Sequence, residues 1–238
     1  MNYAGYADTV FYAGASERAA FIRRTYAHLA VAVLAFIAVE WMLLQLPIAG
    51  AITRTMVGGF SGYSWLVVLA LFMVVSWRAE RWAKSETSPQ MQYLGLGLFV
   101  VAEAVVFLPL LYIASNFASD NVIPMAALIT GFLFTGLTAT VFITRKDFSW
   151  MRSILTIGGF VALGVIVASI IFGFSLGIIF SAIMVLFASV AILYDTSQVL
   201  HHYRTDQHVA ASLSLFASVA LLFWYVLRIV MSLSSSDD

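Results

Sequence analysis

The sequence predicts an all-α membrane protein, a bundle of seven transmembrane helices. Of its 238 residues, 62% are hydrophobic and only 10% are charged, whereas a soluble domain is about half apolar and about a quarter charged. Seven segments approach the roughly 20 apolar residues that a membrane-spanning helix needs. The basic residues outside these segments fall mostly on one side of the bilayer when seven spans are counted. A count wrong by one span would mix the two sides, so this asymmetry supports seven.

The predicted spans are separated by short polar loops. The second is the weakest, because three glycines and a serine between positions 58 and 62 interrupt its start. The fifth and sixth are separated only by the residues around Ser175, which predicts a tight helical hairpin. We expect a flexible cytoplasmic tail over residues 1–20, a transmembrane domain over 21–232 and a polar tail over 233–238. The seven spans are Ala27–Leu46, Met56–Ser76, Leu94–Ile113, Val122–Ile143, Ile154–Phe174, Leu176–Leu200 and Val209–Val230.

The distribution of Lys and Arg predicts the orientation of the bundle. With seven spans, ten basic residues lie on the side of the N-terminus and two, Arg54 and Arg228, lie on the other side. Since cytoplasmic loops carry the excess of Lys and Arg, the N-terminus is expected in the cytoplasm and the C-terminus outside. The ten residues are Arg18, Arg23, Arg24, Arg78, Arg81, Lys84, Arg145, Lys146, Arg152 and Arg204.

The sequence contains no coherent catalytic or metal-binding constellation. The zero net charge gives no reason to expect nucleic acid binding, and the absence of cysteine excludes disulfides and thiolate metal sites. Ser61 and Ser175 stand in glycine-rich contexts that resemble those of hydrolase nucleophiles, but a serine nucleophile needs a base within hydrogen-bond reach. All four histidines are expected on the opposite, cytoplasmic side, and their spacing matches no fixed metal site. We therefore expect neither enzymatic activity nor a bound cofactor.

Four ionisable side chains lie inside predicted spans, where they are expensive and mark functional sites by default. Glu40 and Arg228 both lie in the outer half of the bilayer, which favours a structural ion pair over a role in transport. Glu103 lies near the middle of the third span without a partner at its depth. It could serve as a neutral, hydrogen-bonded acid or as a stopping point for a proton or cation.

Asp195 is the fourth of these groups and lies near the cytoplasmic end of the sixth span. The cytoplasmic end of the second span, where Arg78 and Arg81 emerge, is expected at the same level. An arginine latch there would keep Asp195 ionised, and protonation would release it, which is the basis of a pH switch. The alternative is a static ion pair that closes the helix bundle.

Three sequence blocks resemble the Bax inhibitor family of seven-span membrane proteins. Together they place the resemblance over nearly the whole chain from about Ser16. The blocks are FIRRTY at 21–26, TGLT at 135–138 with TRKDFS at 144–149, and ILYDTS at 192–197 with ASLSLF at 211–216.

The resemblance implies six helices around a central seventh and, in several members, a pH-sensitive calcium leak. That activity is tied to two aspartates on the last two helices and to an arginine latch. Asp195 matches the first aspartate, whereas Ser218 stands at the second position. Since serine cannot titrate, we expect a single acid latched by arginine rather than a two-carboxylate gate.

In this substitution and in its TRKD block, the chain also resembles the bacterial, YccA-like type of this family. That type is an inner-membrane modulator and slowly degraded substrate of the membrane-anchored ATP-dependent protease FtsH, and a short cytoplasmic tail suits engagement by such a protease. The expected function is therefore a non-enzymatic modulator or partner of FtsH in the bacterial inner membrane. The alternative is a calcium or cation leak gated by Asp195, with Glu103 along the path and calcium as the transported ion.

Overall fold

The computed structural model describes residues 9–58, 63–85 and 88–234, and this part of the chain is almost entirely helical. It contains no strand beyond an isolated bridge between Thr9 and Arg204. The all-α class is therefore confirmed. The helices are α1 (Ala15–Leu44), α2 (Ala49–Gly58), α3 (Ser64–Ala83), α4 (Pro89–Phe117), α5 (Val122–Thr144), α6 (Met151–Phe172), α7 (Ile178–His201) and α8 (His208–Ser234).

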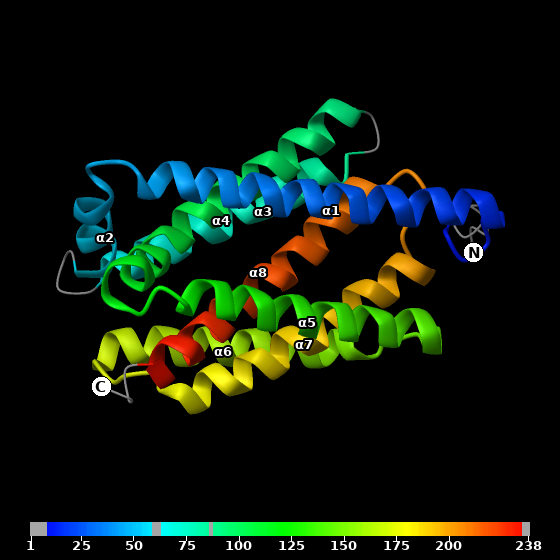
Figure 1. Ribbon diagram of the computed structural model, residues 1–238. Helices are drawn as coiled ribbons and strands as arrows, with labels where there is room; N and C mark the ends of the chain where they lie inside the picture. The colour runs from blue at the N-terminus through cyan, green and yellow to red at the C-terminus, as the bar shows by residue number, and fades with distance from the viewer. Residues whose placement is uncertain (1–8, 59–62, 86–87, 235–238) are drawn as a thin grey trace.

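The long helices run back and forth between two ends of the bundle (Figure 1). We call one of them the basic end, defined by the start of α1 and by the α3–α4, α5–α6 and α7–α8 connections. Six helices, α1 and α4 to α8, are long and apolar enough to cross a membrane. The remaining long helix, α3, has 20 residues, but its last turns carry Arg78, Glu80 and Arg81.

The structure revises the predicted boundaries in two places. The predicted second span, 56–76, corresponds to two helices, because α2 ends at Gly58 and α3 begins only at Ser64. Of the residues predicted to interrupt this span, 59–62 lie outside the described part of the chain. The helix predicted from Ala27 begins at Ala15, within the segment expected to be a flexible tail.

The residues just before α1 are attached to the α7–α8 connection. Val10 is fully buried, and its backbone N–H donates to the carbonyl of Tyr203 at 2.9 Å. The Arg18 guanidinium donates to the carbonyls of Val10 at 3.1 Å and Phe11 at 2.7 Å. Sequence patterning missed this contact because it joins segments almost 200 residues apart.

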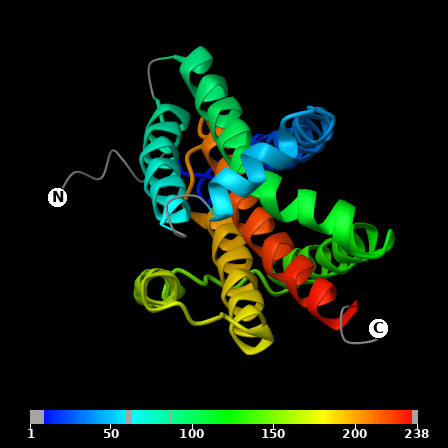
Figure 2. The same cartoon turned by 90° about the vertical axis from the view of Figure 1, so that its left-hand side faces the viewer.

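The last helix is the centre of the bundle, as the family resemblance implies. Figure 1 shows α8 running diagonally between α1 to α4 on one side and α5 to α7 on the other, and it packs against α1, α3, α4, α5 and α7. Helix α6 departs from the expected ring of six, since its extensive contacts are with α7 alone. Figure 2 accordingly shows α6 at the edge of the bundle.

The outer surface of the bundle is apolar. Val31 and Leu34 of α1, Phe132 of α5 and Phe160 of α6 are each more than 60% exposed. Exposed apolar surface of this extent marks a membrane or partner contact, because water would penalise it. The arrangement is that of a helix bundle surrounded by hydrocarbon.

A close approach of α3 and α4 fixes the position of the basic residues on α3. Gly95 allows it, since a Cβ there would lie 2.5 Å from the Ala79 carbonyl oxygen and 2.6 Å from the Ala83 nitrogen. The N-terminus of α4 is capped by Ser88, whose Oγ accepts from the Met91 N–H at 3.4 Å. The close contact at Gly95 therefore holds the last turns of α3, which carry its basic residues, against α4.

Candidate functional site

The candidate site is centred on Asp195, close to the basic end of α7. Its Oδ2 accepts a hydrogen bond of 2.5 Å from Ser218 Oγ on α8. Ser218 is buried and Asp195 is half-buried in the interface between these two helices. The structure thus brings together the two positions that the family resemblance pairs, and a hydroxyl donor takes the place of a second carboxylate.

The predicted arginine latch is absent from this structure. Among the described residues, no salt bridge joins Asp195 to an arginine. The Arg78 guanidinium instead lies 5.8 Å from the centroid of the Trp82 ring. That of Arg81 lies 4.7 Å from the centroid of the Trp77 ring. Each arginine thereby makes a cation–π contact with a tryptophan four residues away on its own helix.

Two other α3 side chains carry the charges that act on Asp195. Glu80 and Lys84 both interact with its carboxylate electrostatically. They also lie 4.0 Å apart, as an i, i+4 ion pair exposed to solvent. Because the two charges are opposite, their effects on Asp195 oppose each other. The residues of α3 that act on Asp195 are thus Glu80 and Lys84 and not the two predicted arginines.

Tyr203 and Ser214 extend the site toward the α7–α8 connection, and the sequence-based reasoning overlooked both. The Tyr203 hydroxyl lies 2.9 Å from Ser214 Oγ. Burial and the neighbouring Asp195 raise the pKa of Tyr203, although the Ser214 hydrogen bond opposes this. Ser214 and Ser218 are four residues apart and so lie on one face of α8. That spacing was the available signal.

Glu103 lines a cavity of about 550 Å³ between α3, α4, α6 and α8. Glu80 and Arg228 also line this cavity, as do Ser76 and Ser169. Glu103 is buried, and no hydrogen bond or ion pair of its carboxyl is present within the described part of the chain. The lining of this cavity thus includes one buried acid, a few other polar side chains and many apolar side chains.

The predicted ion pair between Glu40 and Arg228 is wrong. Glu40 is buried, and neither of its carboxyl oxygens has a hydrogen-bond partner among the residues that the structure describes. Arg228 donates instead to the carbonyl of Leu176 at 3.0 Å. The prediction rested on a shared depth, which does not fix the direction in which each side chain points.

The TRKDFS block forms a clamp on the end of α7 that holds the α5–α6 connection. The Phe148 N–H donates to Ser197 Oγ at 2.8 Å, and His202 Nε2 lies 2.9 Å from Asp147 Oδ2. Partial burial would raise the pKa of Asp147, but hydrogen bonds from Ser149 and the interaction with His202 outweigh this and lower it to about 2.

This clamp contains a serine, a histidine and an aspartate but lacks catalytic geometry. The single atom His202 Nε2 contacts both Ser149 Oγ and Asp147 Oδ2, whereas a catalytic histidine uses a different nitrogen for each partner. Of the two serines considered as nucleophiles, Ser175 lies in the α6–α7 turn, away from the basic end, and Ser61 lies outside the described residues. The described residues contain no group of three or more metal-ligating side chains.

Comparisons with known proteins identify the family. A family model described as "Inhibitor of apoptosis-promoting Bax1" matches residues 18–236. The chain belongs to the Bax inhibitor-1 family. It is 33% identical to uncharacterized protein PA2604 of Pseudomonas aeruginosa over 168 residues, which cover 70% of this chain and 71% of the relative.

Two further relatives show how widely this Bax inhibitor-1 family member is matched. The chain is 33% identical to the modulator of FtsH protease YccA of Escherichia coli over 123 residues, 51% of this chain and 56% of YccA. It is 27% identical to the protein LIFEGUARD 2 of Arabidopsis thaliana over 245 residues, 96% of both chains. These family relationships and the apolar helices make the chain a multi-pass membrane protein.

Proposed function

We propose that this protein acts through protein contacts, as a non-enzymatic modulator and slow substrate of an FtsH-type protease in the bacterial inner membrane. The similarity to YccA, which is named as a modulator of FtsH, supports the proposal. The observation that carries it is the attachment of the segment before α1. Four hydrogen bonds, one from the Val10 N–H and three from the Arg18 guanidinium, restrain this segment at the basic end.

A protease that engages the chain from its N-terminus must first release this segment. The released residues would then pull on Tyr203, which interacts electrostatically with Asp195 in the candidate site. Substrates whose ends are held by specific contacts are degraded slowly, because local opening precedes cleavage. The attachment therefore provides a physical basis for slow processing and for prolonged occupation of the protease.

The proposal is tested by co-purification with FtsH and by degradation in reconstituted membranes. Arg18→Ala should release residues 9–14 and accelerate degradation several-fold. Arg23→Ala is the matched control, since the exposed Arg23 has no hydrogen bond in the structure. Failure to recover FtsH with the tagged chain, or equal degradation of the Arg18 and Arg23 variants, would refute the proposed mechanism.

The proposed orientation places the basic end in the cytoplasm, with seven spans including α3. The loops at this end carry most of the basic residues, in keeping with the positive-inside rule. Because the chain contains no cysteine, single cysteines can be introduced for labelling. A cysteine at Lys146 should react only from the cytoplasmic side, and one at Asn121 only from outside.

A second candidate function is a pH-dependent calcium or cation leak through the cavity beside Glu103. The cavity of about 550 Å³ favours it, because Glu80, Glu103 and Arg228 all line it. Calcium flux into liposomes, measured between pH 5 and 8, would test this function. Glu103→Gln and Asp195→Asn should reduce flux, whereas Glu40→Gln, a buried acid outside the cavity, should not. Absence of flux in the wild-type protein rules this function out.

A further inference from the structure

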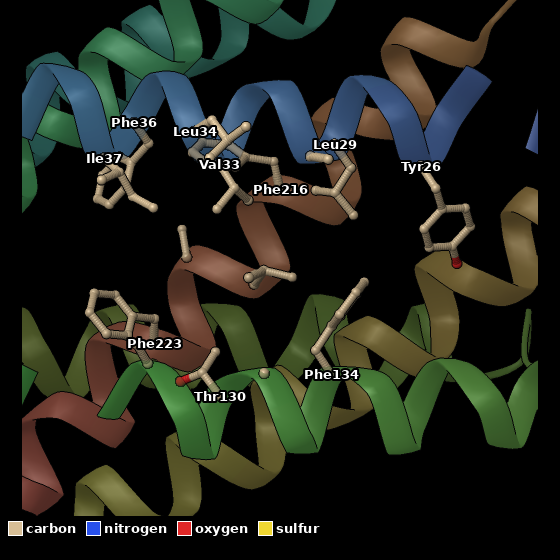
Figure 3. Close-up of a pocket in the computed structure, with 15 residues that line it drawn as sticks. Tyr26, Leu29, Val33, Leu34, Phe36, Ile37, Thr130, Phe134, Phe216 and Phe223 are labelled. Carbon is tan, nitrogen blue, oxygen red and sulfur yellow. The ribbon is translucent and has the colours of Figure 1, made fainter. Parts of the chain in front are cut away.

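Two neighbouring cavities lie along the seam between α1 and α5. The larger, of about 550 Å³, is lined by α1, α5 and α8. Figure 3 shows side chains of α1 and α5 facing each other across this space, with Phe216 and Phe223 of α8 between them. The smaller, of about 370 Å³, lies at the basic end of the same seam. Both helices contact α8 closely but do not pack extensively against each other.

The larger cavity is suited to a hydrocarbon chain. Its lining is almost wholly apolar, and the hydroxyl of Thr130 is already satisfied by the Ala126 carbonyl at 2.8 Å. A buried site that offers so few hydrogen bonds disfavours polar ligands and water. The walls include Leu34 and Ile37, which are more than half exposed on the outer surface of α1. The space is therefore accessible from the hydrocarbon around the bundle.

The cavity is too small for a helix from another protein. One turn of a helix about 10 Å in diameter occupies roughly 400 Å³, and a membrane-spanning partner needs five or six turns. A cavity of about 550 Å³ is too small for that many turns. A flexible chain of methylene groups fits this space without requiring α1 and α5 to separate.

The smaller cavity is cationic. Arg18, Arg145 and His201 line it, together with apolar side chains, and no carboxylate does. The guanidinium of Arg145 has no hydrogen bond or ion pair in the part of the chain that the structure describes. Arg18 donates only to backbone carbonyls, which leave its charge uncompensated. Two guanidinium groups around one space are suited to a phosphate group, which they bind through paired hydrogen bonds.

The order of the two cavities matches the order of groups in a phospholipid. Along α1, Arg18 and Ile22 line the cationic cavity, and the apolar cavity begins one turn later at Tyr26. Tyr26 of α1 contacts Phe142 of α5, with ring centroids 5.8 Å apart, where the two cavities meet. We propose that the α1–α5 seam binds one anionic glycerophospholipid, with its phosphate at Arg18 and Arg145 and an acyl chain against α8.

This inference goes beyond the proposed function and shares Arg18 with it, but its tests use Arg145 and Gly131, which the proposed function does not involve. It assigns the seam to a lipid that binds specifically, not to the annular lipid that surrounds every membrane protein. A bound lipid at this seam would add to the few direct contacts between α1 and α5, such as that of Tyr26 with Phe142.

Native mass spectrometry of the detergent-solubilised full chain tests the proposal with defined lipids. Dioleoylphosphatidylglycerol should bind at least about tenfold more tightly than dioleoylphosphatidylcholine, as expected for a charged hydrogen-bonded contact. Arg145→Gln should remove this preference, whereas Lys146→Gln, its neighbour outside the cavity, should retain it. Equal binding of the two lipids, or equal effects of the two variants, would overturn the phosphate site.

The acyl-chain site has its own matched pair of variants. A Cβ added at Gly131 or at Gly136 meets no atom within 4 Å, so both positions tolerate a side chain, but only Gly131 lines the apolar cavity. Gly131→Leu should weaken lipid binding about tenfold and Gly136→Leu should not, while both variants unfold at the wild-type temperature. If the two variants bind lipid equally, or if Gly131→Leu instead abolishes a dimer seen in the spectra, the lipid assignment is overturned.

Discussion

The hydrogen bond between Ser218 and Asp195 should be one of the strongest single contacts in the bundle. Ser218→Ala removes the hydroxyl that donates to Asp195 Oδ2 at 2.5 Å. Hydrogen bonds to charged groups contribute about 1.5–3 kcal/mol, and a half-buried carboxyl can recover only part of this from water. The free energy of unfolding should therefore fall by about 1.5–3 kcal/mol. For a chain of this size that corresponds to a decrease of about 3–12 °C in Tm.

The assay is unfolding in detergent by denaturant or heat, followed by a double-mutant cycle with Asp195→Asn. Because Ser218 acts through this one contact, the coupling free energy of the pair should be about 1–2 kcal/mol. Ser218→Thr keeps the hydroxyl and should lose little stability. Ser214→Ala breaks the neutral bond to Tyr203 and should cost about 0.5–1.5 kcal/mol, less than Ser218→Ala.

Two results would refute this reasoning. If Ser218→Ala and Asp195→Asn are additive, the short contact contributes nothing specific. If Ser218→Ala is no more destabilising than Ser214→Ala, the carboxyl is satisfied by other groups, and the picture of a single acid held by a hydroxyl is wrong.

Three further predictions follow from the same structure. Glu40→Gln should stabilise the bundle by about 1–3 kcal/mol in thermal unfolding, because the buried carboxyl has no partner and an amide is easier to desolvate; an unchanged or lower Tm would contradict this. Gly95→Ala should cost about 1–3 kcal/mol, since its Cβ would meet the backbone of Ala79 at 2.5 Å; a Tm within 1 °C of wild type would show that α3 shifts freely. The pKa of Asp147 is lowered to about 2, so its carboxylate adds stability above its unfolded pKa of about 4 that disappears as the pH falls through about 2. Because Asp147 is half exposed, its contribution should stay below about 1 kcal/mol, and the Tm difference between wild type and Asp147→Asn should vanish between about pH 4 and 2.

Hydrophobicity predicted the helices well because hydrocarbon leaves few alternatives. An apolar segment of about 20 residues must satisfy its backbone within itself, so length and composition identify a helix without knowledge of its neighbours. The prediction of one span over positions 56–76 failed. The glycines near its start interrupt the apolar segment, and the chain forms two helices, α2 and α3. It also failed before Ala27, because polar residues at a helix start do not reveal tertiary contacts such as that of Val10.

The predicted partners of the charged residues show a different limit. Depth in the bilayer can be counted from the sequence, and it placed Arg78, Arg81 and Asp195 at one level. The direction of each side chain depends on how its helix is rotated, which packing decides. On α3 that rotation brings Glu80 and Lys84 within electrostatic reach of Asp195 and leaves the two arginines against tryptophans.

The sequence by itself determined that this protein is a helical membrane bundle of the Bax inhibitor-1 family with an acid at position 195, because composition, span length and short motifs are local properties. Only the tertiary structure decided what surrounds that acid: Ser218 as its donor, the Glu80–Lys84 ion pair on α3 in place of an arginine latch, and Tyr203 linking it to the N-terminal segment. It also placed the cationic and apolar cavities along one seam. These relationships join residues far apart in the chain, and they follow from helix rotation and packing, which no local pattern encodes.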